Sequence, residues 1–152
     1  MSLSEETRKK ALALLNRRDM SVKEFTDKMT GKGVLPEEAA EAARWLLDLH
    51  ALDDERYAGL VTRHYAAKGY GKRRIQQELY RRGVPRELWD AALDAMPEMG
   101  GPIDRFLRTR LRGRQPDEAE KRRVTNALLR RGYPWSEIRS AWSRLGTELP
   151  EE

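Results

Sequence analysis

Phosphate binding is the first chemistry that this sequence could offer, through a short glycine-rich segment followed by a lysine. Residues 69–72 read Gly-Tyr-Gly-Lys, which resembles the second half of the loop that surrounds nucleotide phosphates with backbone N–H groups. The complete loop needs a hydroxyl residue after the lysine and lies between a strand and a helix. Arg73 occupies the hydroxyl position, and the preceding segment has a helical pattern. We therefore interpret the segment as a hinge and a helix start, and we expect no nucleotide cofactor.

Acid–base or metal chemistry would need grouped carboxylates or imidazoles, and the sequence has one acidic cluster and two histidines. Asp53, Asp54 and Glu55 lie at an expected helix start, where the helix dipole favours negative side chains, so we interpret them as capping residues. His50 and His64 have no cysteine partners and lack the His-Glu-x-x-His spacing of zinc sites. No set of nucleophile, base and oxyanion donor assembles. The sequence therefore predicts a protein that is not an enzyme and that has no metal or cofactor.

Arginine and lysine are the residues whose number and spacing suggest a function. Positions 63–82 hold seven basic side chains against Glu78 alone, a net charge of +6, and positions 105–131 hold ten against three acidic ones, a net charge of +7. The planar guanidinium group of arginine suits both phosphate and carboxylate. If the helices near 72–82 and 117–131 lie side by side, their cations form one stripe that binds nucleic acid or a filament; the alternative is a solvated face. The predicted binding residues are Lys72, Arg73, Arg74, Arg81, Arg82, Lys121, Arg122, Arg123, Arg130 and Arg131.

Four tryptophans form a further group with two possible functions. Trp45, Trp89, Trp135 and Trp142 each lie in or beside the last helical segment before a predicted boundary. Packing in a hydrophobic core is our main interpretation, and stacking on nucleic-acid bases is the alternative.

A pattern that repeats about every fifty residues positions all these side chains. Gly33, Gly83 and Gly132 each directly follow a basic residue, and a proline comes two or three residues after each glycine. The three glycines are 50 and 49 residues apart. Glycine accepts the left-handed conformation that ends a helix, and proline suits the start of the next helix. Such regular spacing indicates a tandem array, so we predict an all-α fold of three three-helix repeats, about nine helices, in an elongated, curved, right- or left-handed array.

Breakers and caps set the expected boundaries of the repeats. The expected parts are a first repeat at 1–52, a second at 53–96, a Gly/Pro linker at 97–103, a third repeat at 103–146 and a frayed tail at 147–152. In the first repeat, caps and apolar periodicity predict helices near 5–18, from Ser21 to Gly33 and from Pro36 to about Leu49. No segment alternates with period two, so we expect no sheet.

Composition limits the partner and the compartment. The chain has 152 residues, of which 36% are charged and 39% hydrophobic, and its net charge is +5 with a pI near 9.6. A basic balance favours an anionic partner, usually nucleic acid. The chain has no cysteine, no apolar run of the roughly 18 residues that a membrane span needs, and no signal-peptide pattern at its start. We therefore expect a cytoplasmic monomer without membrane contact.

Across residues 8–145, the order and spacing of several phrases resemble the RecX family of recombinase regulators. The phrases are Ala11–Ser21, Leu52–Ala58, Lys68–Ile75, Glu78–Leu79, Arg82–Val84 and Arg130–Tyr133. The chain departs from the family pattern in the first helix of the third repeat, which segments 99–102 and 113–116 interrupt more strongly than expected.

The resemblance implies a fold, a partner and an activity. It implies tandem three-helix repeats that bind in the groove of a RecA filament on single-stranded DNA, with little affinity for the naked strand. It also implies inhibition of strand exchange, ATP hydrolysis and coprotease activity, and thus a negative regulator in homologous recombination, DNA repair and the SOS response. The capping, blocking or disassembly of filaments is left open.

Two other functions remain compatible with the residues. A stand-alone helical module could bind naked nucleic acid tightly, with a steep dependence on salt concentration. A helical adaptor could instead bind another protein without nucleic acid, its arginines providing solubility. Binding to bare strands and to RecA-coated strands discriminates among the three.

Overall fold

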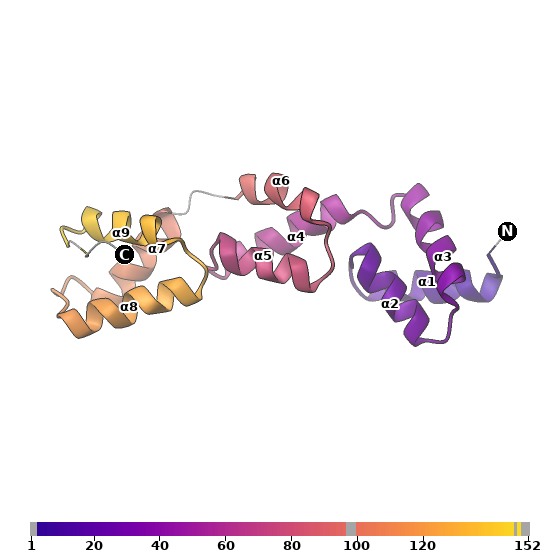
Figure 1. The fold of residues 1–152 in the computed structure, drawn as a ribbon, viewed down its shortest axis with the longest axis horizontal. Helices are drawn as coiled ribbons and strands as arrows, with labels where there is room; N and C mark the ends of the chain where they lie inside the picture. The colour runs from indigo at the N-terminus through magenta and orange to yellow at the C-terminus, as the bar shows by residue number, and fades with distance from the viewer. Residues whose placement is uncertain (1–2, 97–99, 148, 150–152) are drawn as a thin grey trace. The chain divides into compact units, whose positions relative to one another are not determined.

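The computed structural model describes residues 3–96, 100–147 and 149, which contain nine α-helices, one 3-10 turn and no strand (Figure 1). The prediction of an all-α fold is therefore confirmed. The chain divides into two compact units. The first unit comprises residues 1–61 and 78–92, and the second comprises 62–77 and 93–152.

The first unit is built around a core of helices α1 to α3. Phe25, Met29 and Leu46 are fully buried there, and α2 packs against both α1 and α3. The helices of this unit are α1 (Glu5–Arg17), α2 (Val22–Gly31), α3 (Pro36–Asp48), the start of α4 (Asp54–Ala67), the end of α5 (Lys72–Arg81), the 3-10 turn η1 (Arg86–Leu88) and most of α6 (Trp89–Asp94).

Side-chain caps start these helices where the sequence predicts. Ser4 Oγ accepts a hydrogen bond from Thr7 N at 3.1 Å at the start of α1. Ser21 and Glu24 form a complete capping box at the start of α2. Such a cap typically stabilises a helix by about 1 kcal/mol, because it satisfies N–H groups that have no partner in the first turn. The predicted starts of both helices are confirmed.

The second unit has its own core. Its helices are the end of α4, the start of α5, α7 (Gly100–Leu111), α8 (Glu118–Arg130) and α9 (Trp135–Arg144). Leu107, Leu128, Ile138 and Trp142 are fully buried among α7, α8 and α9. Asp117 caps α8, because its Oδ1 accepts a hydrogen bond from Glu120 N at 2.7 Å.

Two segments differ from their expected structure. Helix α7 begins at Gly100, so residues 100–103 are helical rather than linker. Pro102 is tolerated in the first turn, where an N–H group has no helical partner to lose. In the expected tail, Thr147 and Leu149 are 8% and 9% exposed, and Thr147 N donates to Trp142 O at 3.0 Å. Residues 97–99, 148 and 150–152 of the expected linker and tail lie outside the described residues.

The tryptophans pack in two ways. Trp142 is fully buried and donates its indole N–H to Thr125 Oγ1 at 2.9 Å, which confirms core packing for this residue. Trp89 is half-buried and donates to Val84 O at 3.0 Å. Trp45 is half-buried against the first core. None of these three indoles is a freely exposed stacking platform.

Candidate functional site

The ten cations predicted to bind fall in both compact units. The first unit holds Arg81 and Arg82, at the end of α5 and just after it. The second unit holds the other eight. These are Lys72, Arg73 and Arg74 in the first turn of α5, Lys121, Arg122, Arg123 and Arg130 in α8, and Arg131 directly after α8.

The first turn of α5 meets the end of α8 inside the second unit (Figure 1). Gly71 N donates to Arg131 O at 2.7 Å, and Arg73 N donates to Gly132 O at 3.1 Å. These bonds satisfy N–H groups that a first helical turn leaves without partners. A Cβ atom on Gly132 would lie 2.3 Å from Arg74 N, so this close approach requires glycine. The two helices are joined end to end here, so the side-by-side arrangement that one continuous stripe of cations would need is not the one found.

Four arginines around this joint remain available to a partner. The side chains of Arg73, Arg122, Arg123 and Arg130 are exposed, and they make no hydrogen bond or ion pair within the described part of the chain. Each keeps its five N–H donors for a ligand. Lys72 also has no such partner but is half-buried. We call Arg73, Arg122, Arg123 and Arg130 the open arginines.

Three other cations of the second unit already have intramolecular contacts. The guanidinium of Arg74 lies 5.4 Å from the ring centroid of Tyr70, and that of Arg131 lies 4.9 Å from the ring centroid of Phe106. Lys121 forms an ion pair of 3.0 Å within α8. These side chains contribute to the structure of the unit, so we expect them to contribute less to binding than the open arginines.

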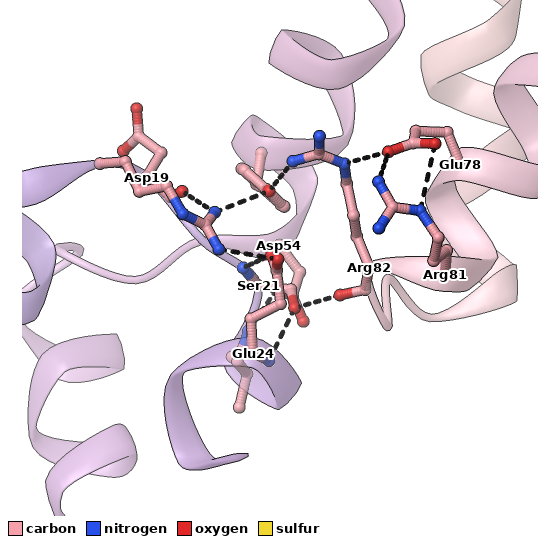
Figure 2. A network of polar contacts seen from close by, with 10 residues as sticks. Asp19, Ser21, Glu24, Asp54, Glu78, Arg81 and Arg82 are labelled. Atoms are coloured by element: carbon pink, nitrogen blue, oxygen red, sulfur yellow. Dashed lines mark hydrogen bonds and ion pairs between the residues drawn. The ribbon is translucent and has the colours of Figure 1, made fainter. Parts of the chain in front are cut away.

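Arg81 and Arg82 hold a buried carboxylate in the first unit. The Glu78 side chain is 2% exposed and lies between the two guanidinium groups (Figure 2). Arg82 Nε is 2.8 Å from Glu78 Oε1, and Arg82 Nη1 donates to Tyr57 OH at 2.6 Å. A buried carboxylate without a cation would be strongly destabilising. Arg82 therefore has structural contacts, and we expect it to contribute less to binding than the open arginines. Arg81 also pairs with Glu78 but keeps a side chain that is 69% exposed.

A second joint connects α2 to the end of α5 within the first unit. The hydroxyl of Ser21, the N-cap of α2, donates to Arg82 O (Figure 2). Arg82 and Arg131 each directly precede a glycine of the repeated phrase. Equivalent carbonyls thus accept the bond in both units, from Ser21 in the first and from Gly71 in the second. Sequence reasoning missed these joints, although the repeated glycine phrase was their available signal.

Each joint also places an arginine over an aromatic ring. The Arg82 guanidinium lies 6.0 Å from the ring centroid of Tyr57, and the equivalent distance from Arg131 to Phe106 is 4.9 Å. Each ring lies 25 residues before its arginine in the sequence. Such contacts contribute about 0.5–2 kcal/mol, depending on burial. The equal spacing was a sequence signal for this contact that the binding prediction overlooked.

Burial and neighbouring groups shift the pKa values of three ionisable side chains beside the first-unit joint. Burial raises the pKa of Asp54, although a backbone N–H at the start of α2 donates to its Oδ1 at 2.9 Å and opposes the shift. Burial also raises the pKa of Tyr57. Burial alone would raise the pKa of Glu24, but the capping-box N–H and the Arg18 guanidinium outweigh it and lower that pKa. These shifts all have structural causes within the joint.

The acidic cluster at the start of α4 acts in capping. Asp53 Oδ1 accepts a hydrogen bond from Arg56 N at 3.1 Å, which confirms the capping interpretation for this residue. Asp54 instead caps α2, through Val22 N. In residues 3–96, 100–147 and 149, no three histidine, aspartate or glutamate side chains gather to hold a metal ion. No helix in these same ranges is long and apolar enough to cross a bilayer.

Family models match two segments of the chain. The model of "RecX, second three-helix domain" matches residues 53–93, and that of "RecX, third three-helix domain" matches residues 105–142. The first segment contains α4, α5 and most of α6, and the second contains α8 and most of α7 and α9. The matches confirm tandem three-helix domains over these ranges.

Known proteins are similar over most of the chain. Regulatory protein RecX of Xanthomonas axonopodis pv. citri (strain 306) is 37% identical over 134 residues, which cover 87% of this chain and 83% of that protein. Regulatory protein RecX of Trichlorobacter lovleyi is 37% identical over 144 residues, which cover 88% of this chain and 92% of that protein. The crystal structure of RecX from Lactobacillus salivarius shares the fold, with a TM-score of 0.83 and 20% identity over 93% of this chain and 95% of that one.

Proposed function

The chain belongs to the RecX family, and we propose that it binds in the groove of a RecA filament on single-stranded DNA. In this proposal it inhibits the recombinase, ATPase and coprotease activities of the filament and performs no catalysis of its own. It is then a negative regulator in DNA repair and the SOS response. The structural observation that supports the proposal is the group of open arginines around the α5–α8 joint.

Open arginines suit a filament because it repeats its anionic groups along its length. One exposed ion pair contributes only about 0.2–1 kcal/mol. Several such contacts made by one chain act together, because the first contact raises the effective concentration of the others. Arg73 and Arg130 come from different helices whose ends are hydrogen-bonded to each other. The geometry of the surface is therefore set before binding, which reduces the entropy lost on association.

Inhibition of the DNA-dependent ATPase of RecA tests the proposal. The test variant reverses the charge of each open arginine, with the substitutions Arg73→Glu, Arg122→Glu, Arg123→Glu and Arg130→Glu. A matched control reverses four exposed cations of the first unit that make no ion pair within the described residues. The control substitutions are Arg17→Glu, Lys28→Glu, Lys32→Glu and Arg44→Glu.

Both variants change the net charge equally, so a general charge effect alters them alike. We expect the test variant to lose inhibition at least about tenfold more than the control, since several ion pairs become repulsive. Circular dichroism checks that both variants fold. Equal loss in the two folded variants would contradict the assignment of the open arginines.

A further inference from the structure

A cleft in the second unit lies between the end of α4, with the two residues that follow it, and α7 from Gly101 to Thr109. Its volume is about 720 Å³, within the range of small-ligand and peptide pockets. We infer that this cleft binds a short acidic peptide that carries an apolar side chain. The inference rests on the proposed function in one respect only, which is the identity of the protein that supplies the peptide.

Positive charge surrounds the cleft. Arg63, Lys68 and Arg105 line it, and none of its lining residues within the described part of the chain is acidic. Arg63 and Arg105 are exposed and form no ion pair within the described ranges. Arginine binds a carboxylate through two parallel hydrogen bonds, and such charge-assisted bonds are stronger than neutral ones. The charges of the cleft therefore complement a ligand with at least two carboxylates.

The lining between these cations is apolar. Ala66, Ala67, Pro102 and Phe106 contribute methyl groups and rings to the cleft. An occupant that carried only charge would leave this surface in contact with water. An aliphatic side chain would cover it, at a gain of about 25 cal/mol for each Å² buried. The lining thus selects for an apolar group next to the acidic groups.

The aromatic residue of the cleft distinguishes a peptide from a nucleic-acid strand. Single strands bind through bases stacked on open aromatic faces. Phe106 is the only aromatic residue among the described lining residues, and the guanidinium groups of Arg110 and Arg131 both lie 4.9 Å from its ring centroid. The ring is already occupied by these contacts, whereas the alanine and proline surfaces suit aliphatic side chains. The observations therefore favour the peptide.

One arginine connects the two walls of the cleft. Arg131 Nη1 donates to Lys68 O, at 3.4 Å, beyond the end of α4, and the same guanidinium packs on Phe106 of α7. Tyr133 OH also donates to Gly69 O at 2.6 Å. The wall formed by α4 is thus held to the α7–α9 core without a ligand. A cleft of defined width needs little rearrangement to bind.

The test is an NMR titration of the full chain, labelled with ¹⁵N, in the absence of RecA. The probes are a capped hexapeptide of glutamate, aspartate and central leucines, and a thymidine hexanucleotide. We expect the peptide to shift the amide signals of Ala66, Gly69 and Thr109. Arg105→Glu reverses one charge, and Ala67→Trp fills the cleft. Each should weaken the affinity for the peptide about tenfold. Arg44→Glu, an exposed position of the first unit, should not.

Three results would overturn the inference: no shift at millimolar peptide, shifts confined to residues outside the cleft, or stronger shifts of the cleft amides by the hexanucleotide than by the peptide. If Ala67→Trp does not fold, Arg63→Glu replaces it. Unchanged peptide affinity in the folded variants would also overturn the inference. Because RecA is absent, failure here leaves the proposed function untouched. Conversely, loss of ATPase inhibition by the open-arginine variant does not test the cleft.

Discussion

Arg131 O accepts a hydrogen bond of 2.7 Å from Gly71 N, and this bond joins the end of α8 to the start of α5. The equivalent carbonyl in the first unit, Arg82 O, accepts its bond from the hydroxyl of Ser21. A helix start thus docks on the glycine turn that ends another helix in both units. The docking places the backbone of Arg73 against Gly132, although the two lie far apart in the sequence.

Gly132→Ala should be more destabilising than Gly33→Ala. Both glycines have a positive φ, of +95° and +92°, which costs a residue with a Cβ about 1–2 kcal/mol. A Cβ on Gly132 would also meet Arg74 N at 2.3 Å, whereas one on Gly33 would meet nothing within 4 Å. The clash should add about 1–3 kcal/mol. Urea unfolding followed by circular dichroism measures both, and equal losses would refute the tight α5–α8 joint.

Arg82→Ala should destabilise the chain more than Arg81→Ala. Removing one partner of a buried ion pair costs about 3 kcal/mol or more, and Glu78 is 2% exposed. The Arg81 side chain is 69% exposed, so its loss should cost about 0–1 kcal/mol. Urea unfolding of the two single variants measures the difference. A larger loss for Arg81→Ala would show that Arg82 is not the main structural partner of Glu78.

The effect of Asp54→Asn on the free energy of unfolding, relative to the original chain, should become more stabilising as the pH rises. Burial raises the folded pKa of Asp54 above its ordinary value of 3.8. A raised folded pKa contributes stability that is present below the unfolded pKa and is lost as the pH rises through the folded pKa. Asparagine keeps an oxygen for Val22 N and does not ionise. The free energy of unfolding of Asp54→Asn minus that of the original chain should therefore increase between about pH 3 and pH 7.

The neighbours of Asp54 define the control for that experiment. Asp53 and Glu24 both raise the pKa of Asp54 further through repulsion, in addition to burial. They remain in the original chain and in the variant, and most of their effect cancels in the difference. A difference that falls with rising pH would mean that the hydrogen bond from α2, and not burial, dominates the pKa of Asp54.

Thr62→Val and Thr125→Val should change stability in opposite directions. Thr62 is 2% exposed, and its hydroxyl has no hydrogen-bond partner within the described residues, so valine should stabilise by about 1 kcal/mol. Thr125 is 5% exposed, and its hydroxyl accepts the 2.9 Å bond from Trp142 Nε1. Valine there should destabilise by about 1–3 kcal/mol, because it leaves a buried indole N–H unpaired. Thermal unfolding of both variants measures the two changes in stability. Changes of the same sign would contradict the buried environments of Thr62 and Thr125.

Local signals made much of the helical fold predictable. Ser4, Ser21 and Asp117 cap helices because their side chains reach N–H groups a few residues away, and such contacts are visible in a linear sequence. Gly33 and Gly132 adopt the left-handed conformation for an equally local reason. The start of α7 was misplaced because glycine and proline in 100–102 indicate a break, whereas packing of Ile103 and Leu107 in the core favours a helix.

The binding surface was less predictable, because it depends on contacts between distant residues. Counting charge gave Arg82 and Arg73 equal weight, yet one neutralises a buried carboxylate and the other is exposed. The burial of Glu78 depends on tertiary packing, which no local pattern in the sequence reveals. The cleft beside Arg63 and Arg105 likewise results from helix packing and has no local sequence pattern.

The most direct measurement of the proposed function is fluorescence anisotropy of the labelled chain with bare single-stranded DNA and with the same DNA coated by RecA, at physiological salt. A filament regulator should bind the coated strand more tightly than the bare strand, and glutamate at Arg73, Arg122, Arg123 and Arg130 should remove that preference. Equal or tighter binding to the bare strand would contradict filament binding and would favour a nucleic-acid-binding module.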